Sequence, residues 1–94
     1  MEINNAIKEN KASIIDVRTR GEFSGGHVAG SINIPLNEIP QRMEELKEMQ
    51  TPLIFCCASG MRSGQATDFA QRQGIDCYNG GSWLQVNYLQ SQSA

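Results

Sequence analysis

Short apolar segments and helical patterns alternate along this chain, and the alternation predicts a sheet of strands joined by helices. Residues 13–17 and 53–57 consist largely of apolar residues, as expected for strands buried on both faces. Shorter strands are predicted at 31–34, where Pro35 stops the pattern, and at 77–79. Strands that alternate with helices favour an α/β domain with a mainly parallel central sheet.

Apolar residues three or four positions apart mark the helical segments between these strands. One helix precedes the first strand, and Thr19 with Glu22 has the spacing of a capping box for a single turn, Arg20 to Ser24. The later helices carry these inward-facing residues: Ile39, Met43, Leu46 and Met49 in one, Ala66, Phe69 and Ala70 in the next, and Trp83, Val86 and Leu89 in the last. Ser63 and Ser82 are the expected N-caps of the last two. Helices are therefore expected on both faces of the sheet.

The length of the chain limits it to one small domain. Ninety-four residues bury only about 60 to 65% of the surface of the unfolded chain, so a single core and one site are expected. We predict one domain over residues 1–94 with a frayed tail at 91–94. No internal repeat, low-complexity tract or interdomain linker interrupts the sequence.

The charge balance is nearly neutral, with eight Lys and Arg against ten Asp and Glu. The basic residues form no run, so a nucleic-acid partner is not expected. The sequence shows neither a charged-then-apolar leader nor an apolar run long enough to cross a membrane. We therefore expect a cytoplasmic protein without a membrane partner, present as a monomer or a weak dimer.

The three cysteines are an odd number and two of them are adjacent, which favours reduced thiols over a disulfide framework. Because side chains alternate along a strand, Cys56 is expected on the opposite face from Cys57, as a buried hydrophobic residue. Cys77 has the same interpretation, with a less favoured alternative as a resolving thiol that forms a disulfide with Cys57. A zinc site built from these cysteines and His27 lacks the usual ligand spacing.

The segment from Cys57 to Ser63 has the strongest chemical signature. A buried strand ends in a thiol, and a short loop containing Gly60 then opens a helix. Such a loop directs N–H groups of Ala58 to Arg62 toward one point at the positive helix end. Arg62 adds a permanent positive charge, so the pKa of Cys57 is expected below the free-thiol value of about 8.5.

A thiolate in this position can attack a sulfur, phosphorus or arsenic centre, and the same N–H groups would stabilise the charge on the covalent adduct. The competing interpretation treats Cys57 as an inert buried thiol and Arg62 as a surface residue of the helix. Strand, loop and helix spacing alone leaves both open.

Several short blocks of this chain resemble the rhodanese family of sulfurtransferases. They are Asp16-Val17-Arg18, Glu22-Phe23, Gly26-His27-Val28-Ala29-Gly30-Ser31, Asn33-Ile34-Pro35, the loop Cys57-Ala58-Ser59-Gly60-Met61-Arg62-Ser63, and the pair Gly80-Gly81. The resemblance covers residues 12–90 and is more specific than the loop alone. It implies a single rhodanese-like α/β domain.

The resemblance also implies an activity. A sulfane sulfur from thiosulfate or a persulfide donor would be held as a persulfide on catalytic Cys57 and passed to a thiophilic acceptor, without a metal or organic cofactor. The substrate-binding residues that it implies are Ala58, Ser59, Gly60, Met61, Arg62 and Ser63. The partners that it implies are a small-molecule or protein sulfur donor and a thiophilic acceptor.

Two alternatives to this enzyme stay open. Phosphatases and arsenate reductases of similar fold carry one more residue between cysteine and arginine, so the shorter span here resembles the sulfur-transferring branch. A sulfur carrier without turnover needs the same stabilised thiolate, and the sequence does not separate carrier from enzyme.

This sequence departs from common family members in three ways. A short first strand is missing, and Gln85 stands where many members have a tryptophan. Ala58 and Ser59 bring no cation to the loop. A pocket whose main charge is Arg62 should attract a dianion such as thiosulfate weakly, which favours a persulfide donor.

Four polar residues outside the loop match family positions that brace the loop region. Asp16, Arg18 and Glu22 are interpreted as a structural network, with Arg18 and Glu22 as the expected ion pair. His27 is interpreted as a hydrogen-bonded packing residue and not as a catalytic base. Ser63, besides capping its helix, could donate its hydroxyl to a bound anion.

Overall fold

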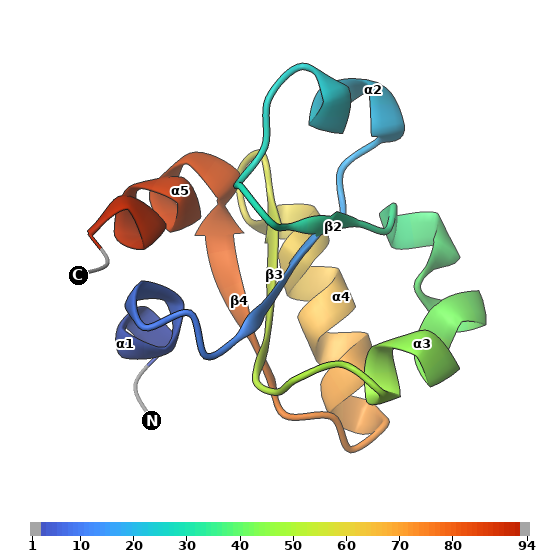
Figure 1. Ribbon diagram of the computed structural model, residues 1–94. Helices are drawn as coiled ribbons and strands as arrows, with labels where there is room; N and C mark the ends of the chain where they lie inside the picture. The colour runs from blue at the N-terminus through green and yellow to red at the C-terminus, as the bar shows by residue number, and fades with distance from the viewer. Residues whose placement is uncertain (1–2, 93–94) are drawn as a thin grey trace.

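The computed structural model describes residues 3–92, and its core is a four-stranded sheet (Figure 1). The strands are β1 (Ser13–Asp16), β2 (Ile32–Asn33), β3 (Leu53–Cys57) and β4 (Cys77–Ser82). Their order across the sheet is β2-β1-β3-β4, and every neighbouring pair is parallel. The predicted α/β class and parallel sheet are confirmed.

Helices cover both faces of this sheet, as predicted. They are α1 (Ile3–Lys8), α2 (Arg20–Ser24), α3 (Met43–Lys47), α4 (Met61–Arg72) and α5 (Trp83–Ser91), with 3-10 turns at Leu36–Glu38 and Pro40–Arg42. α1 and α5 lie together on one side of the sheet, and α3 and α4 lie on the other (Figure 1). No strand precedes β1 among the described residues.

The period-two alternation of β3 divides the core into two clusters. Leu53, Phe55 and Cys57 face the side covered by α3 and α4, where they pack with Ala66 and Ala70. Ile54 and Cys56 face the other side, where they pack with residues of α1 and α5. All five β3 residues are buried, which explains the unbroken apolar run. Cys56 and Cys57 point to opposite faces, as predicted.

The helix boundaries differ from the pattern at two places. The segment marked by Ile39 to Met49 is not one helix, because two 3-10 turns around Pro40 precede the five-residue α3. α4 begins at Met61 with Gly60 as its N-cap residue, so the prediction of Ser63 as the N-cap is wrong. The Ser82 cap is confirmed, since its side chain accepts from the N–H of Gln85.

β4 ends at Ser82 instead of the predicted residue 79, and its carboxyl half contains a bulge. Asn79 lies opposite Phe55 and Gly81 lies opposite Cys56, so Gly80 is the extra residue. A Cβ atom on Gly80 would lie 2.8 Å from Ile54 Cγ2 and 2.9 Å from Val86 Cγ2. Only glycine therefore lets β4 approach β3 and α5 this closely.

The carboxyl terminus is described as far as Gln92. Ser91, the first residue of the predicted frayed tail, still belongs to α5, and Gln92 is the C-cap residue of that helix. Residues 93 and 94, the rest of that tail, lie outside the described residues. Within residues 3–92, none of the helices has both the length and the apolar character needed to span a bilayer.

We predict that Gly80→Ala lowers the free energy of unfolding by about 1–3 kcal/mol, because the added methyl group overpacks the junction of β3 and α5. Urea unfolding followed by circular dichroism measures the change. Gly21→Ala is the matched control, since nothing lies within 4 Å of a Cβ there and the site is helical. The control should be neutral or more stable by up to about 1 kcal/mol. Equal stability of the two variants would contradict the role given to Gly80.

Candidate active site

Cys57 ends β3 beneath the loop that leads into α4, and its side chain is fully buried. Its Sγ accepts hydrogen bonds from the N–H groups of Gly60 at 3.0 Å and Ser63 at 3.4 Å. The Ser63 Oγ also lies 3.4 Å from the sulfur. Three polar groups from one tight loop therefore converge on a single thiol.

The loop takes this shape because Gly60 adopts a left-handed conformation, with φ of 100°. The turn brings the start of α4 over the end of β3, where N–H groups of the first helical turn have no partner within the helix. A Cβ on Gly60 would also lie 3.4 Å from Gly81 Cα, so the loop packs closely on β4. The positive end of α4 thus faces the sulfur.

These contacts lower the pKa of the Cys57 thiol below its ordinary value. Burial alone raises the pKa, since it disfavours the charged sulfur. The hydroxyl and N–H of Ser63, together with the N–H groups of Gly60 and Ser59, outweigh burial by donating to the thiolate. The loop donors therefore stabilise the ionised sulfur by more than burial destabilises it.

Three other loop residues leave their side chains exposed to solvent. Ala58 and Ser59 are exposed, and Met61 is exposed over 75% of its surface. Among the described residues, the hydrogen bonds to Sγ come from Gly60 and Ser63. The predicted convergence is thus narrower than the full range from Ala58 to Arg62.

Arg62 is held by a carboxylate of α2. Its two terminal nitrogens donate to the two carboxylate oxygens of Glu22 at 2.7 and 3.0 Å. This pairing is the main cause that lowers the pKa of Glu22 to about 2, and the hydrogen bond from the Thr19 N–H is the second cause. The stability that the ionised carboxylate contributes is present above its ordinary pKa of about 4.3 and is lost as the pH falls through about 2. Arg62 is therefore charge-compensated at any moderate pH.

Glu22 also closes the capping box of α2, as predicted. Its carboxylate accepts from the Thr19 N–H at 3.0 Å, and the Thr19 hydroxyl accepts from the Glu22 N–H at 3.2 Å. One side chain thus fixes the start of α2 and joins that helix to Arg62.

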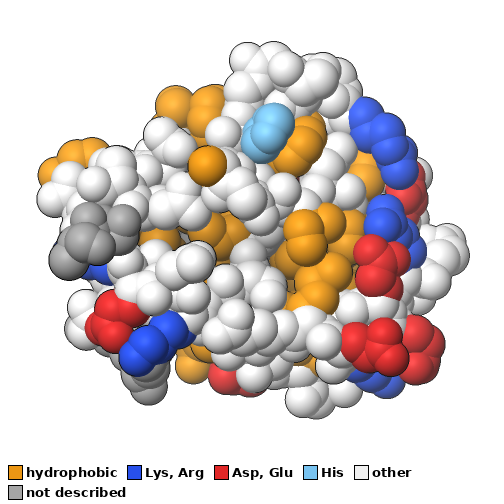
Figure 2. All heavy atoms as spheres, viewed as in Figure 1, with side chains coloured by type: hydrophobic (Ala, Val, Ile, Leu, Met, Phe, Trp, Pro, Cys, Tyr) orange, Lys and Arg blue, Asp and Glu red, His pale blue; other side chains and the backbone are white. Residues whose placement is uncertain are grey.

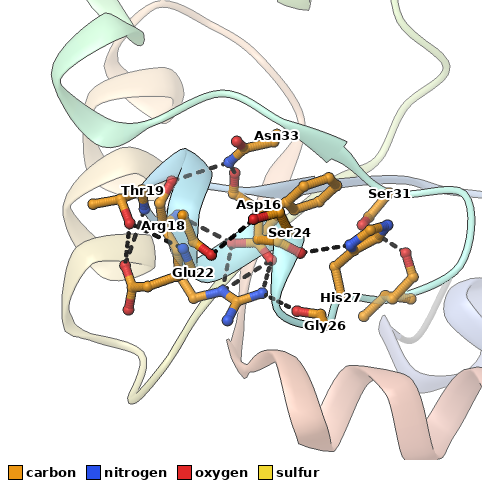
Figure 3. Close-up of polar contacts among 12 residues, drawn as sticks. Asp16, Arg18, Thr19, Glu22, Ser24, Gly26, His27, Ser31 and Asn33 are labelled. Carbon is orange, nitrogen blue, oxygen red and sulfur yellow. Dashed lines mark hydrogen bonds and ion pairs between the residues drawn. The ribbon is translucent and has the colours of Figure 1, made fainter.

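Arg18 pairs with Asp16, so the predicted pairing of Arg18 with Glu22 is wrong. Figure 3 shows the buried Asp16 carboxylate facing the Arg18 guanidinium, with Nη2 to Oδ2 at 2.7 Å. The same Nη2 donates to the Gly26 carbonyl at 2.7 Å, and the guanidinium lies 4.8 Å from the Trp83 ring centroid. Arg18 pairs with Asp16 because the two residues lie close to each other at the end of β1. The Glu22 side chain is bound instead to Arg62.

His27 makes contacts of a packing residue. Its ring stacks on Phe23 with centroids 3.7 Å apart, and Nδ1 lies 2.7 Å from the Phe23 carbonyl oxygen. The side chain is exposed, and no hydrogen bond joins it to Cys57 among the described residues. The hydrogen bond and the stacked ring agree with the interpretation of His27 as a packing residue, on an exposed surface instead of in the core.

The other two thiols are suited to a structural role. Burial raises the pKa of Cys56 to about 12 and that of Cys77 to about 11. Cys77 pairs with Leu53, at the opposite end of β3 from Cys57, which is about 13 Å away at 3.3 Å per residue. A disulfide needs Cα atoms within about 7 Å, so the resolving-thiol alternative is wrong for this fold. Residues 3–92 contain no cluster of three metal-ligating side chains.

The sequence places this site in a known family. Residues 2–84 match the rhodanese-like domain. This chain belongs to the rhodanese-like domain family.

Relatives of this rhodanese-like domain include two proteins of Bacillus subtilis. The chain is 40% identical over 70 residues to the uncharacterised protein YqhL, covering 73% of the chain and 55% of YqhL. It is 35% identical over 67 residues to the putative sulfur carrier protein YrkF, covering 71% of the chain and 36% of YrkF. The chain thus spans about half or less of the length of these relatives.

A solved structure agrees with the fold. The human single-domain sulfurtransferase TSTD1 superposes with a TM-score of 0.73 at 26% identity, covering 97% of this chain and 92% of that one. The rhodanese-like fold therefore extends over nearly the whole described chain.

Sequence reasoning missed one polar residue that this rhodanese-like domain places against its loop. Asn79 donates to the Gly60 carbonyl at 3.1 Å and accepts from the Ser63 hydroxyl at 2.7 Å. The available signal was its place at the end of a strand that neighbours β3 in a parallel sheet, where strand ends gather. The prediction ended β4 at Asn79 and gave the residue no role.

We predict that Ser63→Ala raises the ionisation midpoint of Cys57 by about one pH unit, because the thiolate loses a hydroxyl donor. The pH dependence of iodoacetamide alkylation, with peptide mapping of Cys57, measures the midpoint. Ser91→Ala is the matched control, since its hydroxyl donates to the Tyr88 carbonyl on α5. A midpoint equal to that of the control, in a variant that circular dichroism shows to be folded, would contradict the role of Ser63.

Proposed function

We propose that this rhodanese-like domain is a sulfurtransferase that carries a sulfane sulfur on Cys57. The observation that supports it most is the thiol whose pKa is lowered by converging donors from Ser63 and Gly60. A thiolate at neutral pH is the nucleophile that sulfur transfer needs. The family membership and the sulfurtransferase among the similar structures agree with this chemistry.

The transfer proceeds in two displacements. In the first, the Cys57 thiolate attacks the outer sulfur of a donor R–S–S⁻; a new S–S bond forms and R–S⁻ leaves with the electron pair of the broken bond. With thiosulfate as donor, sulfite is the leaving group. In the second, an acceptor nucleophile attacks the outer sulfur of the Cys57 persulfide and restores the thiolate. No net oxidant is required.

The start of α4 suits the persulfide intermediate. Its outer sulfur carries the negative charge and extends from Cys57 toward the loop opening. There the N–H groups of the first helical turn, among them those of Met61 and Arg62, have no partner within the helix. Such groups at a helix start favour an anion and would stabilise the adduct.

The charge of the site favours a donor that is not a compact dianion. Two of the five N–H groups of Arg62 donate to Glu22, and the negative charge of this carboxylate compensates the positive charge of Arg62 at the loop. Acidic and basic side chains lie together along one edge of the face in Figure 2, and apolar side chains gather beside them. A cavity of about 270 Å³ next to Arg62 is lined mainly by apolar groups, among them Val17, Pro35 and Leu36. Both features suit an organic persulfide better than thiosulfate.

The phosphatase or arsenate reductase alternative fits the geometry less well. A tetrahedral oxyanion needs a free guanidinium over the loop, and here Arg62 is paired in both terminal nitrogens with Glu22. The carrier alternative shares the first displacement and differs only in turnover. A thiosulfate or persulfide donor assay with cyanide as acceptor separates carrier from enzyme.

We predict that the protein gains one sulfur atom when treated with a polysulfide, and that a reducing thiol removes it. Intact mass spectrometry measures the gain. Cys57→Ser should gain none, because the thiolate that attacks the donor is absent. Cys77→Ser is the matched control and should gain one, since that thiol is buried and its pKa is raised to about 11. A Cys57→Ser protein that still gains the labile sulfur would sink the assignment.

We predict that Glu22→Gln lowers the KM for thiosulfate by about threefold or more, because Arg62 loses its ionised partner while glutamine keeps the capping box. Steady-state kinetics with thiosulfate and with an organic persulfide measure the change, which should be small for the persulfide. Glu45→Gln removes the same charge at a pair with Arg42 on α3 and should change neither constant. A thiosulfate KM that is unchanged or raised in Glu22→Gln would contradict the charge compensation.

A further inference from the structure

The Asn79 side chain forms hydrogen bonds to two residues of the Cys57 loop, Gly60 and Ser63. Its Nδ2 donates to the Gly60 carbonyl at 3.1 Å. Its Oδ1 accepts from the Ser63 hydroxyl at 2.7 Å and from the Gly81 N–H at 2.9 Å. Gly60 and Ser63 are the residues whose N–H groups reach the Cys57 sulfur, so Asn79 holds both donors of the thiolate from outside.

The hydroxyl of Ser63 has one hydrogen and two possible acceptors. At 2.7 Å the Asn79 Oδ1 takes that hydrogen, so a neutral Cys57 can donate its own S–H to Ser63 Oγ across 3.4 Å. When Cys57 ionises, the sulfur becomes an acceptor only, and the Ser63 hydroxyl must rotate to give it the hydrogen. The Asn79 Oδ1 then keeps its hydrogen bond from Gly81.

We propose that Asn79 is a positioning residue that controls the Cys57 thiolate through Ser63 and Gly60. It stores the Ser63 hydrogen while the sulfur is neutral or persulfidated and releases it when the sulfur is an anion. Its amide nitrogen donates to the Gly60 carbonyl. This hydrogen bond fixes the orientation of Gly60, so that the N–H of the same residue stays directed at Sγ. The inference rests on the proposed function only in taking the thiolate as the reacting form.

The remaining charged groups near the loop are already paired. Arg62 of α4 is bound to Glu22 of α2, and Arg18 is bound to Asp16 at the end of β1. Cys56 of β3 stays neutral, since burial raises its pKa to about 12. A change at Asn79 therefore acts on Cys57 without disrupting another ionisable pair that faces it.

Asn79→Asp tests the inference, because it keeps the shape of the side chain. The carboxylate would retain the Ser63 hydrogen more strongly and could not donate to the Gly60 carbonyl. We expect the midpoint of Cys57, followed by the NMR shift of its Cβ atom, to rise by about one pH unit, which lowers the thiolate fraction about tenfold at lower pH. Asn87→Asp is the matched control, an exposed change of the same charge on α5. An unchanged midpoint in folded Asn79→Asp would overturn the inference.

A double-mutant cycle separates a route through Ser63 from direct repulsion between charges. The shift caused by Asn79→Asp is measured again in a Ser63→Ala background, where no hydroxyl is present to be captured. The proposal expects that shift to fall to about half or less. An equal shift in both backgrounds would mean that the Ser63 hydroxyl does not carry the effect, and the proposed control of the thiolate through Ser63 would be wrong. Neither outcome depends on sulfur transfer, so the result is independent of the proposed activity.

Discussion

The rest of the site depends on the hydrogen bonds that Gly60 and Ser63 make to the Cys57 sulfur. Burying an anion is costly unless several donors replace the lost water, and one tight loop supplies them here. The left-handed conformation of Gly60 makes the turn, and the start of α4 supplies N–H groups without helical partners. The bulge at Gly80 then brings Asn79 and Gly81 against the loop. The proposed sulfur transfer rests on this local geometry.

Two ion pairs fix the surroundings of the loop in different ways. The buried pair of Asp16 and Arg18 holds the end of β1 to the Gly26 carbonyl, and removing one partner of such a pair typically costs about 3–5 kcal/mol. The half-exposed pair of Glu22 and Arg62 contributes less stability. Under the proposed function, the compensation of the Arg62 charge leaves the donor to be selected more by fit to the adjacent apolar cavity than by long-range attraction.

Patterns that depend on local sequence were predictable, and pairings between distant segments were not. The parallel strands, the two faces of Cys56 and Cys57, the capping box of Thr19 and the Ser82 cap follow from periodicity and side-chain chemistry within a few residues. The partner of Glu22 could not be predicted in this way, because Arg18 and Arg62 are both arginines and only their distances from Glu22 in the folded chain distinguish them. Asn79 was missed for the same reason, since its three contacts join residues that the bulge at Gly80 brings together. The prediction of Ser63 as the N-cap of α4 was wrong because the helix already begins at Met61, after Gly60, without a capping side chain.

The most direct test of the central claim compares the ionisation of Cys57 in the folded chain with that in the same chain unfolded by urea. NMR of the protein labelled at cysteine Cβ gives the midpoint for each thiol in both states. The account predicts that the Cys57 midpoint lies lower in the folded chain than in the unfolded one, while those of Cys56 and Cys77 lie higher. A folded Cys57 midpoint at or above the unfolded value would show that the loop donors do not outweigh burial, and would contradict the account.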